Sequence, residues 1–169
     1  MLLRYPKVDK RDKTVEVLND LLKINSDRIA GYQMALDQSK NIDPGIRAEF
    51  KKIVSDGIGY RQQLIDTIAR LNGDAKTGTT FFGKIYRAWT DLKVTFSVST
   101  QKSVIASCIY NEEIALQVYN AALNLNIAMS DDIKELIEAQ EKELRATHSH
   151  IRKYREARQM TDFRLVYFN

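Results

Sequence analysis

The sequence predicts an all-α protein, a bundle of four long helices, from three observations. The 169 residues include only two prolines and seven glycines, so long stretches of the chain contain no helix breaker. Apolar residues recur at steps of three and four over four segments, which places them on one side of a helix in each. Between these segments stand residues typical of helix ends, such as Pro44, Gly73 and Ser130.

The first two segments predict an antiparallel helical hairpin. We expect one helix over residues 13–40 and a second over 44–71. Asp43 is suited to cap the second helix, and Pro44 to occupy its first position, where a missing N–H leaves no hydrogen bond unmade. Asn72-Gly73 then provides a typical C-terminal stop. Because the connection between the two helices is short, they are expected to lie side by side in opposite directions.

The last two segments predict a second hairpin, with helices over 100–125 and 130–159. Ser130 is suited to cap the final helix, and the two aspartates that follow it favour the positive end of the helix dipole. Residues 160–169 are apolar and aromatic, and we expect them to form a C-terminal tail.

The connection between the two hairpins, 73–99, is long and contains one amphipathic piece, 80–96. As a short fifth helix this piece spans about 25 Å, so the connection can travel the length of the bundle. The helix at 100–125 then runs parallel to the helix at 44–71, which is the one-crossover topology of ferritin-like bundles. The alternative is a fifth helix that covers one end of the bundle and leaves an up-down-up-down order.

An internal repeat supports the crossover. The stretch NSDRIAGYQMAL, from Asn25 to Leu36, aligns without gaps on EEIALQVYNAAL, from Glu112 to Leu123. Both stretches end in Tyr-x-x-Ala-Leu, and a polar residue stands seven positions before each tyrosine. The two halves of the chain therefore look like copies of one helical hairpin.

Four stretches carry a resemblance to a known family: TVEVLNDLLKINSDRIAGYQMAL, GTTFFGKIYRAWTDLK, NEEIALQVYNAAL and ATHSHIR. They are similar to those of a bacterial family of ferritin-like four-helix bundles of unassigned function, related to the YciF-type stress-associated proteins. The resemblance covers about residues 14–158, and G-x-x-Y-R-x-W-x-D-L-K is its most specific part. It implies the fold and a bacterial cytoplasmic setting, but no substrate. Where the family usually has Arg-Gly-Glu-Asp, this chain has Tyr110-Asn111-Glu112-Glu113.

A ferritin-like di-iron centre takes a glutamate from each of two helices and Glu-x-x-His from each of the other two. No glutamate of this chain has a histidine three residues later, and both histidines, His148 and His150, lie in the last predicted helix. We therefore expect no two-ion centre and no required cofactor. The candidates for a reduced site, for iron or another divalent metal, are Glu112, Glu143 and His148.

Polar residues on the inward side of the helices predict a buried layer at mid-bundle. Its expected members are Asn25, Tyr32, Arg61, Glu112, Tyr119 and Gln140. A lone buried carboxylate is costly unless it is paired or neutralised, so a buried Glu112 requires a cation. Arg61 is the first candidate for that cation and Arg145 the second. Two alternatives stay open, in which Glu112 is a metal ligand or reaches water.

Composition weighs against several classes of function. The formal net charge is +4 with basic and acidic residues mixed, so a nucleic-acid surface is the weaker interpretation and rests only on HIRKYREAR. No apolar run is long enough to span a membrane. The single cysteine, Cys108, forms no internal disulfide, as is typical of a reducing cytoplasm.

The chain is expected to form one domain, 1–169, with the bundle core over about 13–159. No residue set indicates nucleophilic or phosphate chemistry. We therefore expect a non-enzymatic, stress-associated, ferritin-like cytoplasmic bundle with a degenerate metal centre, which acts through oligomerisation, with a homodimer favoured, or through a protein partner. The alternative is a metal-binding protein with a mononuclear or weak two-metal centre and a storage or oxidase-like role.

Overall fold

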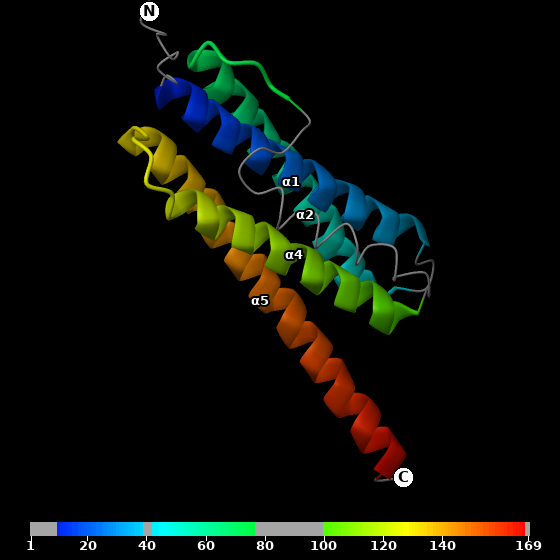
Figure 1. The fold of residues 1–169 in the computed structure, drawn as a ribbon. Helices are drawn as coiled ribbons and strands as arrows, with labels where there is room; N and C mark the ends of the chain where they lie inside the picture. The colour runs from blue at the N-terminus through cyan, green and yellow to red at the C-terminus, as the bar shows by residue number, and fades with distance from the viewer. Residues whose placement is uncertain (1–9, 39–41, 77–99, 168–169) are drawn as a thin grey trace, which may run out of the picture.

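The computed structural model describes residues 10–38, 42–76 and 100–167, and these ranges form a helical bundle without a β-strand. Its helices are α1 (Lys10–Gln38), α2 (Pro44–Arg70), α4 (Gln101–Leu123) and α5 (Asp131–Tyr167). Each of the four segments with helical periodicity corresponds to one helix in Figure 1, so the predicted all-α bundle is confirmed. Within these ranges, no helix combines the length and the apolar character that a membrane span requires.

The helices form two antiparallel hairpins, α1 with α2 and α4 with α5 (Figure 1). α1 and α4 also lie side by side in opposite directions. Asn25 contacts Tyr119, whereas Arg28, further along α1, contacts Glu112, which comes earlier in α4. α4 therefore runs parallel to α2, as the length of the connection between them predicted. The fifth helix expected over 80–96 lies outside the described residues.

Two apolar clusters fill the interior of the bundle. One is built around Leu18 and Ile137, and the other around Phe50 and Ile109, all four almost completely buried. In the second cluster the rings of Tyr32 and Phe50 meet edge to face, with centroids 5.0 Å apart. Burying an apolar side chain of this size stabilises the fold by roughly 1.5–3 kcal/mol. Along α1 and α4 the two clusters are separated by a band of polar residues.

The ends of α2 show why the chain turns where it does. The Asp43 side chain accepts hydrogen bonds from the N–H groups of Gly45 and Ile46, at 2.9 and 3.3 Å, and so caps the helix as expected. At the other end, Asn72 adopts a left-handed conformation with φ of 57°. A Cβ at Gly73 would lie 2.7 Å from both methyl groups of Val15, so only glycine fits this close to α1.

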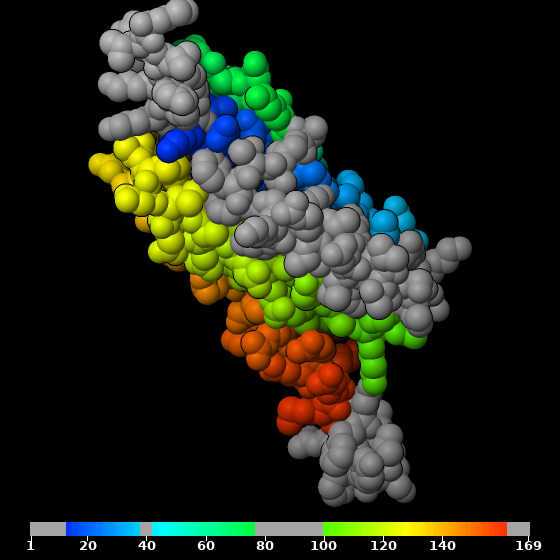
Figure 2. All heavy atoms as spheres, in the orientation of Figure 1, coloured from blue at the N-terminus to red at the C-terminus, as the bar shows by residue number. Residues whose placement is uncertain are grey.

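Ion pairs join both ends of α2 to α5. Arg70 Nη1 lies 3.3 Å from Asp132 Oδ2, and Arg158 Nη2 lies 3.9 Å from Asp43 Oδ2. α5 continues beyond Arg158 to Tyr167. Residues 160–167 are therefore part of α5, and the prediction that they belong to a separate C-terminal tail is wrong. No proline or glycine follows Arg158, and adding a residue to an existing helix costs far less than starting a new one. The C-terminal end of α5 extends past the other described helices (Figure 1). Figure 2 shows the atoms of α4 and α5 side by side along the described part of this hairpin.

Candidate functional site

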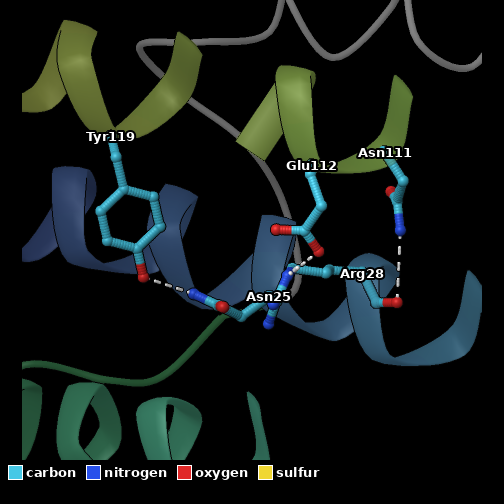
Figure 3. Close-up of polar contacts among 5 residues, drawn as sticks. All are labelled: Asn25, Arg28, Asn111, Glu112 and Tyr119. Carbon is cyan, nitrogen blue, oxygen red and sulfur yellow. Dashed lines mark hydrogen bonds and ion pairs between the residues drawn. The ribbon is translucent and has the colours of Figure 1, made fainter. Parts of the chain in front are cut away.

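The centre of the bundle holds an ion pair between Arg28 of α1 and Glu112 of α4 (Figure 3). Arg28 Nε donates to Glu112 Oε1 at 2.6 Å, and the two side chains are 2% and 0% exposed. The neighbouring Asn111 donates from Nδ2 to the carbonyl oxygen of Arg28 at 3.3 Å. At this depth the attraction between the charges has to offset the hydration that both have lost, so neither partner is tolerated alone.

A glycine on α2 makes room for the guanidinium. A Cβ at Gly57 would lie 2.9 Å from Ile29 Cγ1 and 3.4 Å from Arg28 Nη1, so a larger residue would press on α1. The guanidinium carbon of Arg28 also lies 5.7 Å from the centre of the Tyr32 ring, within the range of a cation–π contact. Arg28 is thus enclosed between α2 and α4, with its charge directed at Glu112.

A chain of hydrogen bonds beside the ion pair connects all four described helices. Asn25 of α1 donates from Nδ2 to the Tyr119 hydroxyl of α4 at 2.6 Å, as Figure 3 shows. That hydroxyl donates to Gln140 Oε1 of α5 at 2.6 Å, and Gln140 Nε2 donates to Gln63 Oε1 of α2 at 2.8 Å. Each of these hydrogen bonds forms only when its two helices are correctly aligned along their length. The chain of hydrogen bonds therefore fixes the register of the four helices.

Burial and the charge of Glu112 control protonation at this centre. Burial, and after it the Glu112 charge, raises the pKa of Tyr32 well above its usual value of 10.0. Burial likewise raises the pKa values of Tyr119 and of the Cys108 thiol. Burial is the largest influence on the pKa of Arg28 and lowers it, but the charge of Glu112, the hydrogen bond to Glu112 and the neighbouring tyrosines together raise the pKa above its usual value. The tyrosines and the thiol are therefore neutral and the guanidinium is charged, so Cys108 is a poor nucleophile.

The structure brings five of the six predicted polar residues together in the core. Asn25, Tyr32, Glu112, Tyr119 and Gln140 are each 2% exposed or less. Arg61 is half-buried, and its Nε has no hydrogen-bond partner among the described residues. It lies outside the chain of hydrogen bonds that links the helices.

The cation beside Glu112 is Arg28, so the predicted pairing with Arg61 or Arg145 is wrong. Arg145 points to the surface, where it pairs with Glu141 on its own helix. Its side chain is 59% exposed, which leaves it no role in the core.

The burial of Arg28 was not predicted, because a single arginine in an amphipathic helix is usually exposed to solvent. A signal was nevertheless present in the sequence. Arg28 stands three residues after Asn25 and four before Tyr32, both predicted to face inward, so it shares their side of the helix. Asn111, the residue before Glu112, is a further buried member that periodicity did not indicate.

The three candidate metal ligands are not gathered around one point. Glu112 is engaged by Arg28, and Glu143 is exposed. His148 Nε2 lies 3.3 Å from Glu113 Oε1, the neighbour of the predicted ligand. Throughout 10–38, 42–76 and 100–167, no three histidine, cysteine, aspartate or glutamate side chains are placed to hold a metal ion.

A family model with the description "Domain of unknown function (DUF2383)" matches residues 13–125. The match includes α2, α4 and almost all of α1, and with them both partners of the ion pair, while α5 lies beyond it. No curated protein matches the chain. Because the matched region covers more than half of the sequence, the chain belongs to this family of domains of unknown function, DUF2383.

Proposed function

We propose that this protein is a non-enzymatic, ferritin-like helical bundle that acts through oligomerisation or a protein partner. The observation that carries the proposal is the ion pair between Arg28 and Glu112, which are 2% and 0% exposed at the centre of the bundle. A guanidinium therefore lies beside Glu112, which is the candidate metal ligand that the structure places at the centre of the bundle. The buried polar residues therefore serve to hold the helices together, and we infer that the function resides on the surface of the bundle.

The charge of Arg28 opposes metal binding at this centre. A divalent cation needs several free donor atoms, and Glu112 supplies at most one, because Oε1 accepts from Arg28 Nε at 2.6 Å and only Oε2 is without a partner among the described residues. A metal ion beside the guanidinium would also experience repulsion that is strong in a medium of low polarity. Among the described residues, no group of three histidine, cysteine, aspartate or glutamate side chains is placed to hold a metal ion here.

Two observations support the ferritin-like part of the proposal: the relative direction of α2 and α4, and the resemblance of the sequence to a ferritin-like family. α4 is parallel to α2, which is the direction that these two helices have in one-crossover bundles. The sequence of residues 80–96 is amphipathic, as a crossover helix would be. The association with stress and the cytoplasmic setting rest on the resemblance to YciF-type proteins. The association with stress is tested by measuring the amount of this protein in its source cells before and after osmotic and oxidative challenge, and the cytoplasmic setting by fractionating the same cells.

Elemental analysis tests the non-metallic centre. Protein purified from medium supplied with iron, manganese and zinc, then desalted, should carry far less than one ion per chain. Glu112→Gln, which can still accept from Arg28, should have the same metal content as the wild type. One or more ions per chain in the wild type, lost in Glu112→Gln, would overturn the proposal and establish a metal centre at Glu112.

A second candidate function, metal binding at the surface, is favoured by one contact. Glu113 of α4 and His148 of α5 offer a carboxylate and an imidazole 3.3 Å apart, and both are ligands that zinc accepts. Calorimetric titration with zinc would compare the wild type with His148→Ala and with the matched control His150→Ala. Binding that disappears only in His148→Ala would support this function, whereas equal traces for all three proteins would exclude it.

A further inference from the structure

The side of α2 that faces away from the bundle has features that its own fold does not explain. We define the outer face of α2 by its exposed residues Ala48, Lys51, Ser55, Ile58, Gly59, Gln62, Asp66 and Ala69. Ile58, in the middle of this face, is 52% exposed. Half-buried Val54 and Ile65 lie one and two turns away on the same side of the helix, so Ile58 extends an apolar strip to the surface.

Gly59 is the second unexplained feature. A Cβ at this position would meet nothing within 4 Å, in contrast to Gly57, where it would meet α1. A glycine inside an exposed helix destabilises it by about 1 kcal/mol relative to alanine. Its small size is useful where another backbone approaches closely, and no described part of this chain approaches it.

The outer face of α2 is arranged symmetrically about the bond between Ile58 and Gly59. Lys51 and Asp66 stand the same number of residues from this midpoint, on opposite sides. The same holds for Ser55 with Gln62 and for Ala48 with Ala69. When a helix pairs antiparallel with its own copy across a two-fold axis at this midpoint, residue i meets residue j and residue j meets residue i, so the two members of each of these pairs would meet.

We propose that the outer face of α2 binds the same face of a second copy of this chain, antiparallel, with the two-fold axis beside Ile58 and Gly59. Ile58 of each copy then covers Gly59 of the other. Lys51 of each copy lies at the same height as Asp66 of the other, which gives two complementary charge pairs. The inference rests on the proposed function and names the partner, a second copy.

The local contacts agree with this geometry. Asp66 Oδ1 accepts from Gln62 Nε2 at 2.8 Å, which holds the carboxylate on the outer face of α2. Lys52, the neighbour of Lys51, is engaged by Asp56 on its own helix at 2.6 Å. Lys51 is therefore the lysine available for a pair between copies. A contact made by one helix of each copy is small, so we expect dissociation in the micromolar range or above.

Light scattering after size-exclusion chromatography, from low micromolar to sub-millimolar protein, tests the inference. The wild type should become dimeric as its concentration rises, and Ile58→Glu should stay monomeric. Lys51→Glu and Asp66→Lys should each weaken dimerisation by about tenfold or more, because like charges then face each other twice. The double variant Lys51→Glu/Asp66→Lys should restore it, since both pairs are complementary again.

Two controls keep the outcomes distinct. Glu138→Lys and Lys142→Glu reverse exposed charges on α5, and their dimerisation should equal that of the wild type. Circular dichroism checks that every variant is folded. A monomeric wild type at all concentrations would overturn the inference, while the low metal content expected under the proposed function could still hold. If the wild type dimerises and Ile58→Glu dimerises equally well, the dimer forms through another surface and the outer face of α2 is excluded. The same conclusion follows if the double variant fails to restore the dimerisation that the single variants Lys51→Glu and Asp66→Lys lose.

Discussion

A buried charge pair is weak evidence for stability, and Arg28 with Glu112 illustrates why. Removing one partner of such a pair strands the other charge and typically costs about 3–5 kcal/mol, whereas apolar replacements of both are often tolerated. The pair therefore penalises any arrangement of α1 and α4 that separates the two residues. Its benefit is a defined alignment of the helices, to which the hydrogen bond from Asn25 to Tyr119 adds a second constraint.

Two glycines on α2 allow a matched test at the residue scale. Gly57→Ala should destabilise the fold by roughly 1–3 kcal/mol, because its methyl group would lie 2.9 Å from Ile29 Cγ1. Gly59→Ala, with nothing within 4 Å, should stabilise the monomer by about 0.5–1 kcal/mol. Urea denaturation at low protein concentration measures both. Equal effects of the two substitutions would contradict the close approach of Arg28 and Ile29 to Gly57.

At the scale of the helices, the cap of α2 accounts for its sharp start. The Asp43 carboxylate accepts from two backbone N–H groups that the helix itself leaves unpaired. Asp43→Ala should therefore lower the free energy of unfolding by about 1 kcal/mol, whereas Asp43→Asn keeps the capping oxygen and should lie close to the wild type. Urea denaturation would separate the two. An equally large loss in Asp43→Asn would attribute the effect to the charge, and hence to the Arg158 pair.

Sequence periodicity was sufficient to predict the helices, because local signals decide where they begin and end. The start at Pro44 follows from the Asp43 cap, the stop of α2 follows from Asn72-Gly73, and α5 begins at Asp131, directly after Ser130. The end of α5 at Tyr167 was not predicted, because the apolar and aromatic character of residues 160–169 indicated a separate tail, although no proline or glycine precedes them to end the helix.

The candidate site was predictable only in part. Periodicity placed Glu112 and Tyr119 in the interior, because it reports which side of a helix faces inward. It could not identify the partner of Glu112, since that depends on how far two helices are shifted along each other. Only the contact between α1 and α4 decides that Arg28 meets this carboxylate.

At the scale of the whole molecule, the internal repeat is reflected in the contacts. Asn25 donates to Tyr119, and Glu112, the counterpart of Asn25 in the repeat, is near enough to Tyr32 for its charge to raise the pKa of that tyrosine. The two halves therefore place matching residues at the centre of the bundle, but only Asn25 and Tyr119 form a hydrogen bond, since the Tyr32 hydroxyl has no partner among the described residues. Arg28 breaks the equivalence, because Ala115 occupies the matching position in the second half.

The buried tyrosines predict how stability depends on pH. Burial raises the pKa values of Tyr32 and Tyr119 above the 10.0 of an exposed tyrosine, so above that pH the folded state binds more protons than the unfolded chain. Their contribution is complete below about pH 10 and is lost as the pH rises further. Urea midpoints from about pH 8 to about pH 11 should fall at the alkaline end, and less steeply in Tyr32→Phe. An unchanged slope in Tyr32→Phe would contradict the assignment.

The most direct test of the ion pair at the centre of the bundle is a double-mutant cycle on Arg28 and Glu112, measured by urea denaturation in the presence of a chelator. Arg28→Met and Glu112→Met should each lower the free energy of unfolding by about 3–5 kcal/mol, and the double variant should lose much less than the sum. The exposed pair Lys52–Asp56, at 65% and 35% exposure, is the control and should show a coupling of at most about 0.5 kcal/mol. Additive losses for Arg28 and Glu112 would contradict the ion pair and return Glu112 to the candidate metal ligands.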